Sequence, residues 1–83
     1  MTPSITIFTQ RGCLFSDEAV AWLQDRSLPF TERDIETDLD ALAALEALET
    51  IVTPTILVGD EVIYGFDAER LDSLITSPAT LPV

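Results

Sequence analysis

The chain has 83 residues, 47% of them apolar, and its 15 acidic side chains against four basic ones give a net charge of −11. This length allows one small domain, and the apolar fraction is typical of a packed globule rather than a disordered chain. The charge argues against binding to nucleic acid or to an anionic membrane, because both need clustered basic side chains. It would attract a partner with a basic face, although an acidic surface that only maintains solubility is the simpler interpretation.

Few residues of this chain can carry out chemistry. It has one cysteine and no histidine, which excludes an internal disulfide, a catalytic Ser-His-Asp or Cys-His pair and a histidine-ligated metal. We therefore predict that no metal ion is needed for folding. The first ten residues lack the basic and apolar segments of a signal peptide, and no apolar run reaches the ~20 residues of a membrane span. Together with the lone thiol, this predicts a reducing, cytoplasmic location.

Strand and helix patterns alternate along the first half of the chain. Residues 4–9 alternate apolar and polar side chains and predict a central strand. After a loop at residues 10–13, apolar residues recur at helical spacing over residues 14–26, and Pro29 ends this helix. Residues 30–35 are short and charged, which suits a strand at the edge of a sheet.

The second half begins with a helix and continues with a hairpin. Residues 39–49 are rich in Ala, Leu and Glu, and Asp38 before them is a good N-cap, so they predict a helix. Strands are predicted at residues 55–58 and 61–64, joined by a tight Gly-Asp turn. Asp67 can then cap a last helix.

These elements give the order β-α-β-α-β-β-α. The first β-α-β should form a parallel unit and the later strand pair an antiparallel hairpin. We therefore predict an α/β fold, with a four-stranded mixed sheet and helices on both faces. The domain is expected to span residues 1–76, and residues 77–83, which contain two prolines, to form a loose tail.

The turn between the first strand and the first helix, Gly12–Ser16 (GCLFS), resembles a one-cysteine (C-x-x-S) active site of the glutaredoxin family. Two other segments match the family. Thr53 and Pro54 stand where the fold carries a cis-proline, and Gly59–Asp67 resembles the terminal hairpin and the loop that follows it. The three segments occur in the right order and spacing and cover nearly the whole chain. The resemblance implies a thioredoxin-like fold and an oxidoreductase that catalyses thiol–disulfide exchange.

Cys13 is the predicted nucleophile of this site. It stands where the first helix begins, and the unpaired N–H groups and the dipole of that helix favour a thiolate. Ser16 can place its hydroxyl near the sulfur, and Arg11 can add a positive charge, whereas Asp17 and Glu18 oppose a second negative charge. We expect the pKa of Cys13 to lie below that of a free cysteine. A buried, inert thiol is the alternative, which the position of Cys13 in a loop disfavours.

The resemblance implies that glutathione is the co-substrate and that no cofactor is tightly bound. Thr53 and Pro54 would dock the substrate, while Arg11 and Asp67 would hold the charged ends of glutathione; alternatively, Asp67 only caps a helix. Many members of the family have a lysine shortly before the cysteine, where this chain has Gln10 and Arg11. The other residues of the predicted binding surface are Leu14, Phe15, Gly65 and Phe66.

Ser16 stands where dithiol redoxins have a second cysteine, so a mixed disulfide on Cys13 must be resolved by an external thiol. The leading prediction is a monomeric, glutathione-dependent monothiol oxidoreductase that acts on glutathionylated proteins or small disulfides. The first alternative is a dimer that bridges a [2Fe–2S] cluster through Cys13 and glutathione thiols, although Leu14 adds bulk where such proteins have glycine. The second is a redox-silent adaptor with an apolar patch of Leu14, Phe15 and Tyr64.

Overall fold

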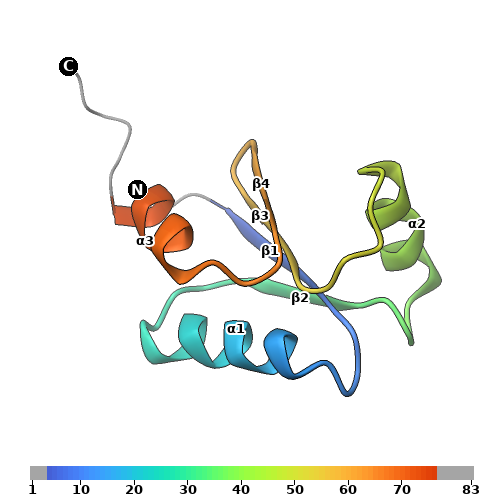
Figure 1. The fold of residues 1–83 in the computed structure, drawn as a ribbon, viewed down its shortest axis with the longest axis horizontal. Helices are drawn as coiled ribbons and strands as arrows, with labels where there is room; N and C mark the ends of the chain where they lie inside the picture. The colour runs from blue at the N-terminus through green and yellow to red at the C-terminus, as the bar shows by residue number, and fades with distance from the viewer. Residues whose placement is uncertain (1–3, 77–83) are drawn as a thin grey trace.

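The computed structural model describes residues 4–76, which form a four-stranded sheet and three helices (Figure 1). In chain order the elements are β1 (Ile5–Thr9), α1 (Leu14–Asp25), β2 (Thr31–Asp34), α2 (Leu39–Ala47), β3 (Thr55–Val58), β4 (Glu61–Tyr64) and α3 (Ala68–Thr76). The predicted order β-α-β-α-β-β-α is confirmed. The bounds of α2 differ from the prediction at its C-terminal end, because the helix ends at Ala47 rather than at residue 49. The predicted tail, residues 77–83, lies outside the described residues.

The sheet has the strand order β2-β1-β3-β4. β1 pairs in parallel with β2 and antiparallel with β3, and β3 pairs antiparallel with β4. β1 is therefore an inner strand and the charged β2 an edge strand, as the sequence predicts. Because Ile56 of β3 pairs with Ile7 on one side and with Ile63 on the other, the three isoleucines lie on one face of the sheet.

The helices cover both faces of the sheet, with α1 and α3 on one side and α2 on the other (Figure 1). On the first face, Leu23 of α1 and Leu71 of α3 pack against the isoleucines of β1, β3 and β4. On the second face, Leu45 of α2 packs with Phe8 of β1. The class and the layer arrangement of the fold agree with the prediction. None of the helices within residues 4–76 is long and apolar enough to cross a membrane.

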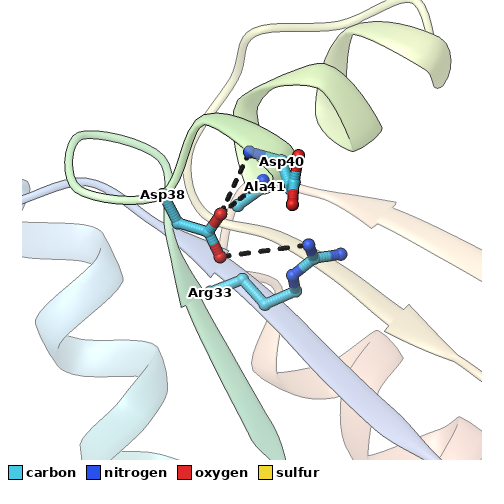
Figure 2. A network of polar contacts seen from close by, with 4 residues as sticks. All are labelled: Arg33, Asp38, Asp40 and Ala41. Carbon is cyan, nitrogen blue, oxygen red and sulfur yellow. Dashed lines mark hydrogen bonds and ion pairs between the residues drawn. The ribbon is translucent and has the colours of Figure 1, made fainter.

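Asp38 begins α2 by capping its first turn. Its Oδ1 accepts hydrogen bonds from the backbone N–H groups of Asp40 at 3.0 Å and Ala41 at 3.2 Å, and its Oδ2 lies 4.0 Å from Arg33 of β2 (Figure 2). The cap satisfies donors that have no partner inside the helix. The contact with Arg33 connects the start of α2 to the edge strand.

We expect Asp38→Ala to lower the free energy of unfolding by about 1 kcal/mol, the usual cost of losing an N-cap, which lowers Tm by roughly 4–8 °C in a domain of this size. Asp38→Asn keeps an acceptor but removes the charge, and should stay close to the original protein because exposed ion pairs contribute little. Thermal unfolding followed by circular dichroism measures both. Equal losses in the two variants would show that the contact with Arg33, rather than the cap, stabilises this region.

Candidate active site

The loop that follows β1 turns sharply and places Cys13 at the start of α1. The N–H of Cys13 donates to the carbonyl of Gln10 at 3.0 Å, and Gly12 at the third position of this turn has φ +82°. That φ is typical of a type II turn and favours glycine. Cys13 itself is the N-cap residue of α1, with extended backbone. Its side chain is half-buried, so the prediction of a partly exposed thiol at a helix N-terminus is confirmed.

The loop before β3 approaches the thiol from the other side. The peptide bond between Thr53 and Pro54 is cis, as predicted. Cys13 Sγ lies 3.6 Å from the carbonyl oxygen of Thr53, to which the thiol donates, and 3.6 Å from the Thr53 hydroxyl. The hydroxyl of Thr55 donates to the carbonyl of Val52 at 2.6 Å and braces this loop. Residues 40 positions apart in the sequence thus meet at the sulfur.

The end of the terminal hairpin is bound to the same loop. The N–H of Gly65 donates to the carbonyl of Pro54 at 2.7 Å. Phe66 packs edge-on against Trp22 of α1, with ring centroids 6.5 Å apart. Asp67 accepts a hydrogen bond from the backbone N–H of Arg70 at 3.1 Å, so it caps α3. The capping role of Asp67 is therefore confirmed, and a role toward a ligand stays a prediction.

Hydrogen bonds around the sulfur lower the pKa of Cys13. The Ser16 hydroxyl makes the largest contribution; the hydroxyl of Thr53 and the backbone N–H groups of Ser16 and Phe15 add smaller ones, and burial of the thiol opposes them. Ser16 is 1% exposed, and its hydroxyl has no hydrogen-bond partner among the described residues while Cys13 is a thiol. A thiolate is the acceptor that this hydroxyl lacks, because a charged sulfur accepts far more strongly than a thiol.

The causes that lower the pKa of Cys13 are hydrogen bonds, and no charged side chain is among them. Arg11 is exposed in the turn, and Asp17 and Glu18 are exposed on the first turn of α1, but the causes at Cys13 are hydrogen bonds and burial alone. That Arg11 adds a positive charge near the sulfur stays a prediction. The predicted contribution of the helix N-terminus is present through the two backbone N–H groups, yet it is smaller than that of the Ser16 side chain.

Apolar side chains are exposed on the segments around Cys13. Leu14 and Phe15 follow it at the start of α1 and are 67% and 61% exposed. Helical spacing groups Phe15 with Ala19 and Leu23, but only the latter two are buried. Val52 and Tyr64 are exposed as well, next to the cis-proline loop and at the end of β4. The three residues of the predicted apolar patch, Leu14, Phe15 and Tyr64, are therefore all exposed, and Val52 is an exposed apolar residue that the prediction did not include.

Gln10 is a polar residue of the site to which the sequence assigned no role. Its Nε2 donates to Glu36 at 3.1 Å, and its Oε1 accepts from the Thr53 hydroxyl at 3.3 Å. The only available signal was the predicted parallel pairing of β1 with β2, which brings the residues after both strands to one edge of the sheet. Within residues 4–76, no three or more Cys, Asp or Glu side chains gather in a way that could hold a metal ion.

Comparison with known proteins places this geometry in a family. The family model Glutaredoxin matches residues 5–63, which include Cys13 and the cis-proline loop. Among solved structures, the thioredoxin-like protein BC3987 is 27% identical over 87% of this chain and 100% of its own, with a TM-score of 0.80. No sequence among the curated proteins matches significantly.

Two other solved structures share the fold at lower identity. The glutaredoxin-like NrdH-redoxin from Escherichia coli, described by its thioredoxin-like activity profile, is 24% identical over 90% of this chain and 99% of its own, with a TM-score of 0.79. The glutaredoxin from Archaeoglobus fulgidus is 16% identical over 90% of this chain and 88% of its own, with a TM-score of 0.78. The fold is thus shared with a glutaredoxin and with a glutaredoxin-like redoxin.

Proposed function

Because the chain belongs to the glutaredoxin family, we propose that it is a monothiol, glutathione-dependent thiol–disulfide oxidoreductase in which Cys13 is the nucleophile. The observation that carries the proposal is the local environment of the Cys13 sulfur. The sulfur is half-buried at a helix N-terminus, beside the cis-proline loop and one turn before an unpartnered hydroxyl. These features favour a thiolate, which is the reactive form in disulfide exchange.

The proposed reaction has two exchange steps. The Cys13 thiolate attacks the glutathione sulfur of a glutathionylated protein; that disulfide breaks, and the protein thiolate leaves and takes a proton from water. Cys13 then carries glutathione as a mixed disulfide. The thiolate of a free glutathione attacks the glutathione sulfur of this adduct, so that oxidised glutathione forms and Cys13 leaves as a thiolate. Across both steps, one free glutathione thiol is consumed, and the disulfide between protein and glutathione is exchanged for oxidised glutathione and a protein thiol.

The cationic side chains of the described residues support Arg11 as the contact for a glutathione carboxylate. Arg26 stacks on Trp22 at 3.7 Å, Arg33 contacts Asp38, and Arg70 is paired with Glu61 at 3.1 Å. Within residues 4–76, Arg11 is the one arginine with no such partner, and it precedes Cys13 by two positions. On a surface with net charge −11, Arg11 would be the cation available to an anionic ligand on the turn that precedes Cys13.

The remaining groups of the proposed binding surface lie on the two loops around the sulfur. Thr53 and Pro54 would dock the extended peptide of glutathione, because the Thr53 backbone already contacts Cys13. Asp67 keeps one carboxylate oxygen beyond the one that caps α3, and this oxygen would meet the ammonium group of the ligand. Apolar contacts would come from Leu14, Phe15, Gly65 and Phe66.

The test is mass spectrometry after incubation with oxidised glutathione. We expect one glutathione on Cys13 and none on Cys13→Ser, followed by complete removal of the adduct by reduced glutathione. Arg11→Gln should slow adduct formation severalfold, while Arg70→Gln, which removes an equal charge away from the thiol, should not.

Two outcomes would contradict the proposal. If Cys13 does not react with oxidised glutathione at pH values where iodoacetamide alkylates it, glutathione is not the substrate. If an adduct forms but only a dithiol such as dithiothreitol removes it, the reductant is a dithiol rather than glutathione.

A further inference from the structure

A chain of three polar side chains leads from the edge of the sheet to the sulfur. Glu36 follows β2, Gln10 follows β1, and Thr53 precedes β3. The Gln10 side chain donates to Glu36 at 3.1 Å, and the Thr53 hydroxyl lies 3.3 Å from Gln10 Oε1. The same hydroxyl lies 3.6 Å from Cys13 Sγ. The Thr53 hydroxyl therefore has two acceptors within reach, Gln10 Oε1 and Cys13 Sγ.

The Thr53 hydroxyl has one proton and can donate it to one of these acceptors at a time. A thiol sulfur is a weak acceptor, so the amide oxygen of Gln10 holds the proton while Cys13 is protonated. A thiolate is a strong, charged acceptor, so deprotonation of Cys13 turns the hydroxyl toward the sulfur. The hydrogen bond from Thr53 to Gln10 is then lost, and this loss offsets part of the stabilisation that the Thr53 hydroxyl gives to the thiolate.

We propose that Gln10, held by Glu36, is a positioning residue that competes with Cys13 for the Thr53 hydroxyl and thereby limits how readily Cys13 forms its thiolate. Glu36 fixes the amide by accepting from Nε2, which leaves Oε1 aimed at Thr53. The contact is between side chains separated by 43 positions, so it depends on the folded arrangement of the strands. This inference deepens the proposed function, because it concerns the reactive form of the same thiol.

Other charged groups near the site do not offer the same route. The causes that lower the pKa of the thiol are hydrogen bonds from Ser16, Thr53 and Phe15, and the charged groups on the neighbouring segments are not among them. Glu36 reaches Cys13 only through Gln10 and Thr53. The groups concerned are Arg11 before Cys13, Asp17 and Glu18 on α1, Glu36 after β2 and Asp67 before α3.

The test measures the alkylation rate of Cys13 by iodoacetamide against pH, which reports the thiolate without any glutathione. At a pH below the midpoint, we expect Gln10→Met to react about threefold faster, because a neutral competing hydrogen bond is lost. Thr53→Val should react roughly tenfold slower, because a hydrogen bond to the thiolate is lost. In the Thr53→Val background, Gln10→Met should have no further effect.

Matched variants separate this competition from a general disturbance of the loop. Gln24→Met on the last turn of α1 changes the same residue type away from the thiol and should leave the profile unchanged. Thr53→Ser keeps the hydroxyl, so Gln10→Met should again accelerate alkylation in that background.

Three results would overturn the inference: a slower or unchanged rate for Gln10→Met, an equal acceleration in the Thr53→Val background, or no acceleration in the Thr53→Ser background. None of them bears on whether glutathione is the substrate, which the adduct experiment decides separately.

Discussion

Ser16→Ala is expected to change the reactivity of Cys13 and the stability of the fold in opposite directions. Below the pKa of Cys13, alkylation should slow by about tenfold or more, because the thiolate loses its largest stabilising hydrogen bond. In the same pH range the free energy of unfolding should rise by about 1 kcal/mol, because a buried hydroxyl without a partner is removed. Iodoacetamide kinetics and thermal unfolding measure the two effects on one sample.

The difference in free energy of unfolding between the original protein and Ser16→Ala should depend on pH. The pKa of Cys13 is lowered in the fold from an ordinary value near 9.0, so above the folded pKa the unfolded chain binds more protons than the folded one. Stability of the original protein therefore rises as pH increases from the folded pKa toward 9.0, and this gain is lost as pH falls back through the folded pKa. Ser16→Ala should show a smaller rise, because its thiolate is less favoured.

Cys13→Ala is the control for this experiment, since it removes the titrating group and should abolish that pH-dependent rise. Ser73→Ala removes an exposed serine from α3 and should leave both reactivity and its pH dependence unchanged. A Ser16→Ala protein that reacts as fast as the original would show that the hydroxyl does not reach the thiolate, and the role of Ser16 would then be wrong.

Local patterns in the sequence were sufficient to predict the helices and strands and the position of the nucleophile Cys13. Helical periodicity and the caps at Asp38 and Asp67 predict where helices begin, because these signals act over a few residues. The place of Cys13 follows from a glycine turn between a strand and a helix. The cis bond before Pro54 came from the family resemblance, since an X–Pro bond taken alone is usually trans.

Contacts made by side chains distant in the sequence were not predictable in the same way. The hydrogen bonds of Gln10 join residues 26 and 43 positions apart, and they exist only once β1 lies between β2 and β3. The exposure of Phe15 departs from helical spacing, because it stands in the first turn of α1 and does not join the core. The burial of Ser16 could have been predicted from the sequence. Helical spacing places Ser16 on the same face of α1 as Ala19 and Leu23, which are apolar residues of the core.

The glutathione adduct of Cys13 is expected to persist in the absence of added thiol, and Ser16→Cys is expected to release it. In the original protein the neighbouring hydroxyl cannot attack a disulfide. In Ser16→Cys a thiol replaces that hydroxyl one helical turn from the adduct. Its thiolate attacks the Cys13 sulfur, a disulfide forms within the chain, and glutathione leaves as a thiolate. Because the attack is intramolecular, release should be at least about a hundredfold faster than in the original protein.

The measurement is a time course of the purified adduct by mass spectrometry, with free glutathione quantified at each point. Ser16→Ala is the matched control and should retain its adduct as long as the original protein does, since neither variant has a second thiol. Loss of the adduct from the original protein at low concentration, without added thiol, would exclude a monothiol mechanism. Retention of the adduct by Ser16→Cys would show that position 16 does not reach the mixed disulfide, because a thiol placed there would otherwise displace glutathione from Cys13.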